Sequence, residues 1–79
     1  MWFVYIIKSI SIEFLYVGST NDLDRRILEH NEKGVQSTKH YAPLELEAYI
    51  AVKTEKKARE LEKYLKVGSG KAILKKRIL

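Results

Sequence analysis

The sequence predicts an α+β fold, a small three-stranded antiparallel sheet flanked by helices in the order β-β-α-β-α-α. Two short apolar runs near the N-terminus are rich in β-branched and aromatic residues, and a third run at residues 44–52 alternates between apolar and other side chains. Helical spacing marks the segments around that third run. With 79 residues and no cysteine, the chain is expected to form a single domain over residues 1–79 without disulfides.

The first two strands are expected to form a hairpin. Residues 2–8 (WFVYIIK) and 13–18 (EFLYVG) are too short for buried helices and have the composition of strands. The polar link between them suits a tight connection, and a symmetric hairpin places Tyr5 roughly opposite Tyr16. We therefore expect two tyrosines on one face of the sheet, with Gly18 ending the second strand.

A helix and the third strand are expected next. The helix should run from about residue 22 to 33, with Asn21 as its N-cap and Gly34 as its C-cap. After a loop, the segment LELEAYIAV at 44–52 carries apolar residues at every second position. This alternation is the clearest strand signal in the chain.

Two further helices complete the expected order. Thr54 is the expected N-cap of a helix over residues 55–66, which Gly68 would close. Ser69 is the expected cap of a short last helix over residues 70–78.

Charge is divided unevenly along the chain. The net charge is +5, yet the first 52 residues hold five Lys or Arg against seven Asp or Glu, whereas residues 53–79 hold ten against three. A basic segment favours a polyanion such as nucleic acid through counterion release, although a solvated helical surface has the same composition. The candidate nucleic-acid contacts, named here the basic tail, are Lys71, Lys75, Lys76 and Arg77.

The N-terminal apolar run does not indicate export or a membrane span. It has no basic residues before it and reaches Lys8 too soon for a secretory signal or a transmembrane segment. We therefore expect a cytoplasmic protein without a membrane partner.

Ionisable side chains fall on helix stripes that should face the core. Arg26 and His30 lie on the inward stripe of the first helix, and Glu62 lies on that of the second helix, while Arg25 and Glu60 point away. Burial of such groups costs several kcal/mol unless each is paired or faces a wet cleft.

Two interpretations of these stripes stay open. One is a structural ion pair between Arg26 and Glu62. The other is a cleft that also receives Tyr5 and Tyr16 and so gathers an acid, a base, a fixed cation and two phenols. The second interpretation is favoured because it accounts for all five residues at once.

Four segments carry a resemblance to a known family. They are FVY at residues 3–5, YVG at 16–18, DLDRRILEH at 22–30 and ELEKYLKVGSG at 60–70. With this spacing the chain resembles the GIY-YIG nuclease superfamily over nearly its whole length. It is similar to the small stand-alone members and to the N-terminal nuclease domain of the excision-repair excinuclease.

The resemblance implies hydrolysis of phosphodiester bonds in DNA with one divalent metal, Mg²⁺ or Mn²⁺, bound by Glu62. Tyr5 would orient or deprotonate the attacking water, and His30 would relay the proton. Arg26 would stabilise charge on the phosphoryl oxygens, and Tyr16 would lie against the phosphate or the water. The implied setting is DNA repair, recombination or processing.

The chain also departs from the family pattern. Phe3 and Val4 replace the glycine and isoleucine of the first signature, and Ser19 stands where the excision-repair nucleases carry a lysine. The asparagine that some relatives place after the metal glutamate has no clear counterpart. Two alternatives therefore stay open: a nucleic-acid-binding module that has lost catalysis, and a nuclease subunit active only with a protein partner that supplies its specificity.

Overall fold

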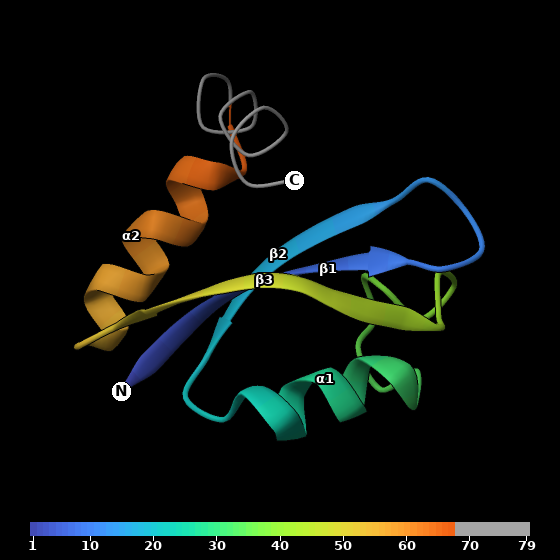
Figure 1. Ribbon diagram of the computed structural model, residues 1–79, viewed down its shortest axis with the longest axis horizontal. Coiled ribbons are helices and arrows are strands. Elements are labelled where there is room, and N and C mark those ends of the chain that lie inside the picture. Colours follow the sequence, from blue (N-terminus) through green and yellow to red (C-terminus); the bar gives the residue numbers. More distant parts are fainter. Residues whose placement is uncertain (68–79) are drawn as a thin grey trace.

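The computed structural model describes residues 1–67, which form three strands and two helices in the order β-β-α-β-α (Figure 1). The strands pair antiparallel in the order β2-β1-β3. The predicted α+β class and three-stranded antiparallel sheet are thus confirmed, whereas Gly68, Ser69, the last predicted helix and the basic tail lie outside the described residues. The elements are β1 (Trp2–Ser9), β2 (Leu15–Thr20), α1 (Leu23–Asn31), β3 (Leu44–Val52) and α2 (Glu55–Leu65).

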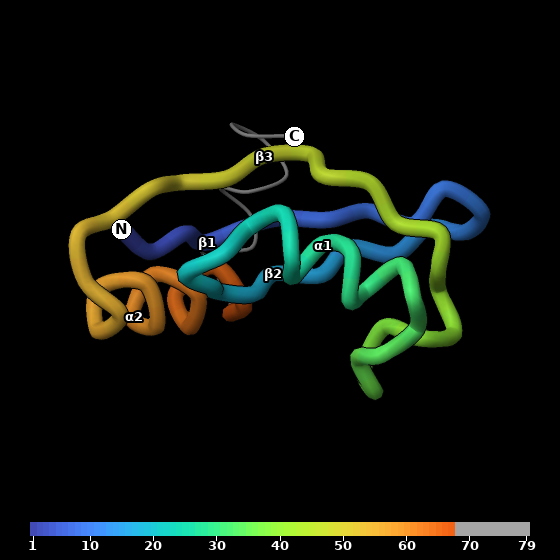
Figure 2. The backbone as a smooth tube through the Cα atoms, turned by 90° about the horizontal axis from the view of Figure 1, so that it is seen from below, coloured from blue at the N-terminus to red at the C-terminus, as the bar shows by residue number. Residues whose placement is uncertain are grey.

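The two helices cover opposite faces of the sheet (Figure 1). Successive residues of a strand point to opposite faces, so β1 contributes to two apolar clusters. Val4 and Ile6 pack with α2, whereas Tyr5 and Ile7 pack with α1. Figure 2 shows the tube of β1 between β2 and β3, which form the two edges of the sheet. Side chains from both faces can therefore meet around the edge strand β2.

The hairpin register differs from the symmetric one predicted. Tyr5 pairs with Gly18, and Tyr16 pairs with Ile7, so the two tyrosines are diagonal neighbours rather than opposite each other. They still share one face of the sheet, with ring centroids 6.4 Å apart. The prediction that Gly18 ends the second strand is wrong, because β2 continues through the glycine to Thr20.

The ends of α1 also differ from the prediction. Asp22, not Asn21, is the N-cap, because its carboxylate accepts a hydrogen bond from the backbone N–H of Arg25. The helix ends at Asn31, before Gly34, and Lys33 takes the left-handed conformation with φ of 62°. A lysine thus fills the backbone position usually given to a glycine after a helix.

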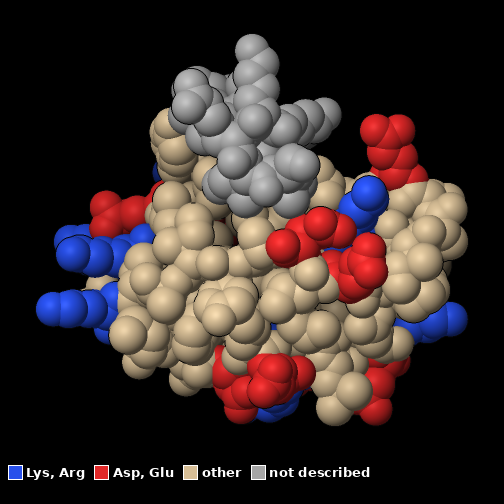
Figure 3. All heavy atoms as spheres, in the orientation of Figure 1, with Lys and Arg blue, Asp and Glu red and all other residues tan. Residues whose placement is uncertain are grey.

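Helix α2 begins where the sequence predicted. The Thr54 hydroxyl accepts a hydrogen bond from the backbone N–H of Lys57, which confirms Thr54 as the N-cap. Figure 3, viewed from the side of β3, shows Lys and Arg side chains gathered beside α2. Within residues 1–67, no helix has the length and apolar character needed to span a membrane.

Candidate active site

The candidate site is built around the edge strand β2. Tyr16 and Ser19 lie on opposite faces of this strand, because their partners in β1 are Ile7 and Val4, which point to opposite faces. Tyr16 therefore faces the side of α1, and Ser19 faces the side of α2. The edge of the sheet is the place where groups carried by the two helices come together.

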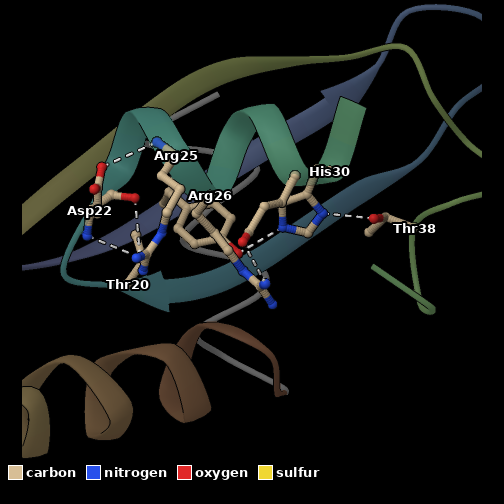
Figure 4. A network of polar contacts seen from close by, with 8 residues as sticks. Thr20, Asp22, Arg25, Arg26, His30 and Thr38 are labelled. Carbon is tan, nitrogen blue, oxygen red and sulfur yellow. Dashed lines mark hydrogen bonds and ion pairs between the residues drawn. The ribbon is translucent and has the colours of Figure 1, made fainter. Parts of the chain in front are cut away.

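A buried line of three hydrogen-bonding groups lies on the α1 side. The Tyr5 hydroxyl is 2.8 Å from Nε2 of His30, and Nδ1 of the same ring is 2.6 Å from the Thr38 hydroxyl (Figure 4). His30 and Thr38 are fully buried, and Tyr5 is 1% exposed. Both ring nitrogens are thus engaged, which fixes the orientation of the imidazole.

Gly18 makes room for the Tyr5 phenol. A Cβ at this position would lie 2.5 Å from Cζ of Tyr5 and 3.0 Å from Cε2 of Tyr16. Only a glycine lets the backbone of β2 approach the two tyrosines this closely.

Burial sets the protonation states of this line. It raises the pKa of Tyr5 to about 12, although the neighbouring Arg26 guanidinium acts in the opposite direction. Burial, reinforced by the positive charge of Arg26, lowers the pKa of His30 to about 4. At neutral pH, Tyr5 is therefore a phenol and His30 a neutral ring that can accept one proton.

Arg26 lies at the rim of this buried line. Its guanidinium is 3.0 Å from the Glu29 carboxylate, and its side chain is 35% exposed. The ion pair between Arg26 and Glu62 that one interpretation expected does not form, since Glu29 takes its place. Arg26 also lines a surface hollow with Ser19, Arg25 and Arg59, so the exposed Arg25 lies beside the site.

Glu62 lies on the α2 side and has two partners. Oε1 accepts a hydrogen bond from the Ser19 hydroxyl at 2.6 Å, and Oε2 is 2.7 Å from Nζ of Lys66. Burial alone would raise the pKa of Glu62, but the bonds from Lys66 and Ser19 outweigh it and hold the pKa below its usual range. The carboxylate is therefore ionised at neutral pH.

This carboxylate fits a divalent metal held through one protein ligand. The Glu62 side chain is 21% exposed and so can be reached from solvent. Residues 1–67 contain no group of three or more His, Cys, Asp or Glu that could enclose a metal by themselves. Mg²⁺ often binds through one or two carboxylates, with water and phosphate oxygens as its other ligands, so the donor set is compatible with Mg²⁺.

Lys66 connects the two sides of the site. Its ammonium, besides contacting Glu62, lies 5.2 Å from the centroid of the Tyr16 ring. The Tyr16 ring is in turn 5.2 Å from the His30 ring, and the charge of Glu62 contributes to the raised pKa of Tyr5. Tyr5, Tyr16 and His30 are thus in mutual contact, Arg26 lies beside them, and Glu62 reaches them through Lys66.

Sequence reasoning missed two members of this arrangement and gave no role to a third. Lys66 follows Glu62 by four residues on one helix, a spacing that predicts an ion pair. Thr38 lies in a loop where no periodic pattern marks it, so nothing in the sequence pointed to its bond with His30. Ser19 stands out in the sequence only as a departure from the family pattern, not as a partner of Glu62.

Comparison with known proteins assigns the chain to a family. The model of the GIY-YIG catalytic domain matches residues 1–77, and the chain belongs to this family. The chain is 36% identical over 66 residues to a UPF0213 protein of Vibrio campbellii, with 82% of this chain and 62% of that protein covered. It is 37% identical over 65 residues to the UPF0213 protein YazA of Bacillus subtilis, with 81% and 65% covered. The chain thus spans less than two thirds of the length of these two relatives. No solved structure matches the chain significantly.

Proposed function

We propose that the chain is a divalent-metal-dependent endonuclease domain that hydrolyses phosphodiester bonds in DNA, in the cytoplasm and in the setting of DNA repair, recombination or processing. The observation that carries the proposal is the buried hydrogen bond between Tyr5 and the neutral His30, close to an arginine and an ionised glutamate. Family membership supports the same class of reaction.

Tyr5 and His30 supply a path for the proton of the attacking water. With a pKa of about 12, Tyr5 is protonated at neutral pH and cannot act as a base in its resting state. It must therefore give up its own proton as it accepts one from water. Nε2 of His30, at 2.8 Å, is placed to receive the proton that Tyr5 gives up. The path requires the tautomer in which Nδ1–H donates to the Thr38 hydroxyl, so Thr38 is a positioning residue.

Arg26 and Glu62 act on the phosphate. The Arg26 guanidinium, half-exposed at the rim, can donate hydrogen bonds to phosphoryl oxygens as negative charge develops there. Glu62 would hold Mg²⁺ or Mn²⁺, and Tyr16 would lie against the phosphate or the water. The bound metal would polarise the phosphoryl oxygen and neutralise charge in the transition state.

The experiment that tests this function is a cleavage assay on a panel of DNA structures. Duplex, nicked, branched and single-stranded DNA are incubated with the protein in Mg²⁺, in Mn²⁺ and in EDTA. We expect cleavage of at least one substrate with metal and none in EDTA. Salt-dependent binding without cleavage of any substrate would instead support the binding-module alternative, and cleavage that appears only with an added protein would support the partner-dependent subunit.

A further inference from the structure

Lys66 makes two contacts, of which an ordinary helix-stabilising ion pair would need only one. Its ammonium contacts Oε2 of Glu62 at 2.7 Å and also lies over the ring of Tyr16, a residue of the other side of the site. The other i,i+4 ion pair of α2, between Arg59 and Glu55, is far more exposed: the side chain of Arg59 is 65% exposed and that of Glu55 is 49% exposed. The side chains of Lys66 and Glu62 are 42% and 21% exposed.

The two oxygens of Glu62 are used differently. Oε1 accepts the Ser19 hydroxyl, a neutral partner that orients the carboxylate. Oε2 carries the ammonium, which is the only cationic group paired with this carboxylate in the described part of the chain. A divalent cation that binds Glu62 meets the positive charge of Lys66 and is opposed by it.

The lysine side chain is suited to leave this position. It is a compact point charge on a flexible four-carbon stem, so it can exchange one anionic oxygen for another at small structural cost. Lys66 also lines a surface hollow with Arg59, Glu62 and Lys63, which is open to a ligand. A phosphate brought to Glu62 with its metal would lie within reach of the released ammonium.

We propose that Lys66 is a built-in counter-cation of the site, which neutralises Glu62 in the absence of metal and moves to a substrate phosphate when a divalent cation binds the carboxylate. The proposal rests on the proposed function, since it takes Glu62 as the metal ligand. It differs from a simple helix-stabilising pair because it couples metal binding to phosphate binding.

Metal affinity measures the first half of the proposal without any catalysis. Mn²⁺ is titrated into the parent, Lys66→Gln and Lys63→Gln, with free Mn²⁺ followed by electron paramagnetic resonance. Lys63 lines the same hollow, and Lys63→Gln removes the same charge as Lys66→Gln. It therefore controls for the general electrostatic effect of removing one positive charge near Glu62. We expect Lys66→Gln to bind Mn²⁺ about two- to five-fold more tightly than the parent, as loss of a competing, partly exposed ion pair predicts, with a smaller change in Lys63→Gln.

DNA binding measures the second half. Affinity for a short DNA is compared in Ca²⁺ and in EDTA, because the ammonium is available to phosphate only after a cation has displaced it. Lys66→Gln should weaken binding more in Ca²⁺ than in EDTA, whereas Lys63→Gln should weaken it equally in both.

The outcomes separate this proposal from the one on which it rests. If Lys66→Gln and Lys63→Gln bind Mn²⁺ equally, or if Lys66→Gln loses the same DNA affinity with and without Ca²⁺, the counter-cation role is overturned while Glu62 can still be the metal ligand. If Glu62→Gln binds Mn²⁺ as well as the parent, the metal assignment in the proposed function fails together with the role of Lys66.

Discussion

Acidification should lower the free energy of unfolding through the buried His30. An exposed histidine, which has the same environment in the folded and the unfolded chain, does not contribute to this pH dependence. Burial and the positive charge of Arg26 lower the pKa of His30 to about 4, with Glu29 acting weakly in the opposite direction. As the pH falls, His30 takes up a proton near pH 6.5 in the unfolded chain, its ordinary pKa, but only near pH 4 in the folded protein. The contribution of the neutral His30 to stability is therefore fully present above the pKa of the unfolded chain, and it is lost as the pH falls from about 6.5 towards about 4.

The size of this loss follows from the two pKa values. A shift of one pKa unit corresponds to about 1.4 kcal/mol, so the free energy of unfolding should fall by about 3 kcal/mol over the whole window. Between about pH 7.5 and about pH 5 the fall should be about 2 kcal/mol. Protonation of Glu62 does not affect the free energy of unfolding in this pH range. Because the pKa of Glu62 is lowered in the folded protein, the stability that its carboxylate contributes is lost only at more acid pH.

Urea unfolding followed by circular dichroism measures this fall directly. The free energy of unfolding is determined across the range for the parent, for His30→Gln and for His40→Gln, which removes the exposed histidine. The pH dependence should persist in His40→Gln and disappear in His30→Gln. A parent protein whose free energy of unfolding stays flat between these pH values would refute the burial of a neutral His30.

Three further outcomes are expected. Gly18→Ala should lower the free energy of unfolding by about 1–3 kcal/mol, because its Cβ overlaps the buried Tyr5 phenol, whereas Gly34→Ala, whose Cβ meets only a carbonyl oxygen at 3.4 Å, should be nearly neutral in the same denaturation assay. Thr38→Val should cost about 1–3 kcal/mol by leaving Nδ1 of His30 without its partner and should slow cleavage, with both effects reversed in Thr38→Ser. Replacing the four residues of the basic tail by alanine should flatten the slope of log DNA affinity against log salt concentration, and an unchanged slope would place the DNA contacts elsewhere.

The sheet was predictable to different degrees along its length. The bounds of the alternating segment match those of β3, Leu44–Val52. A register shift opposite Ile6 and Ile7 sends Leu44 to the cluster on the α1 side and Ala48 and Val52 to the cluster on the α2 side, which simple alternation does not predict. The hairpin register was not predictable, since it depends on how the connecting loop closes, here with the Ser9 backbone N–H donating to the Phe14 carbonyl. Gly18 indicated a strand end, yet its small size serves close packing inside β2.

The site was predictable only as far as helical periodicity reaches. The stripe of α1 correctly placed His30 inward, and the half-buried Arg26 beside it. The bond from His30 to Thr38 depends on a tertiary contact, so it could not be predicted from spacing. Ionic partners three or four residues apart, such as Arg26 with Glu29 and Glu62 with Lys66, have the spacing that predicts an ion pair.

The central claim is that Glu62 serves the reaction rather than the stability of the fold. Its most direct test is single-turnover DNA cleavage in Mg²⁺ by Glu62→Gln, measured beside thermal melting and DNA binding, with Glu60→Gln on the exposed face of α2 as the control. Loss of a partly exposed ion pair should cost only about 1 kcal/mol or less, so Glu62→Gln should stay folded and bind DNA while it cleaves at least about a hundred-fold more slowly than the parent. The control should cleave like the parent. Undiminished cleavage by Glu62→Gln, or a loss fully explained by unfolding, would contradict the account.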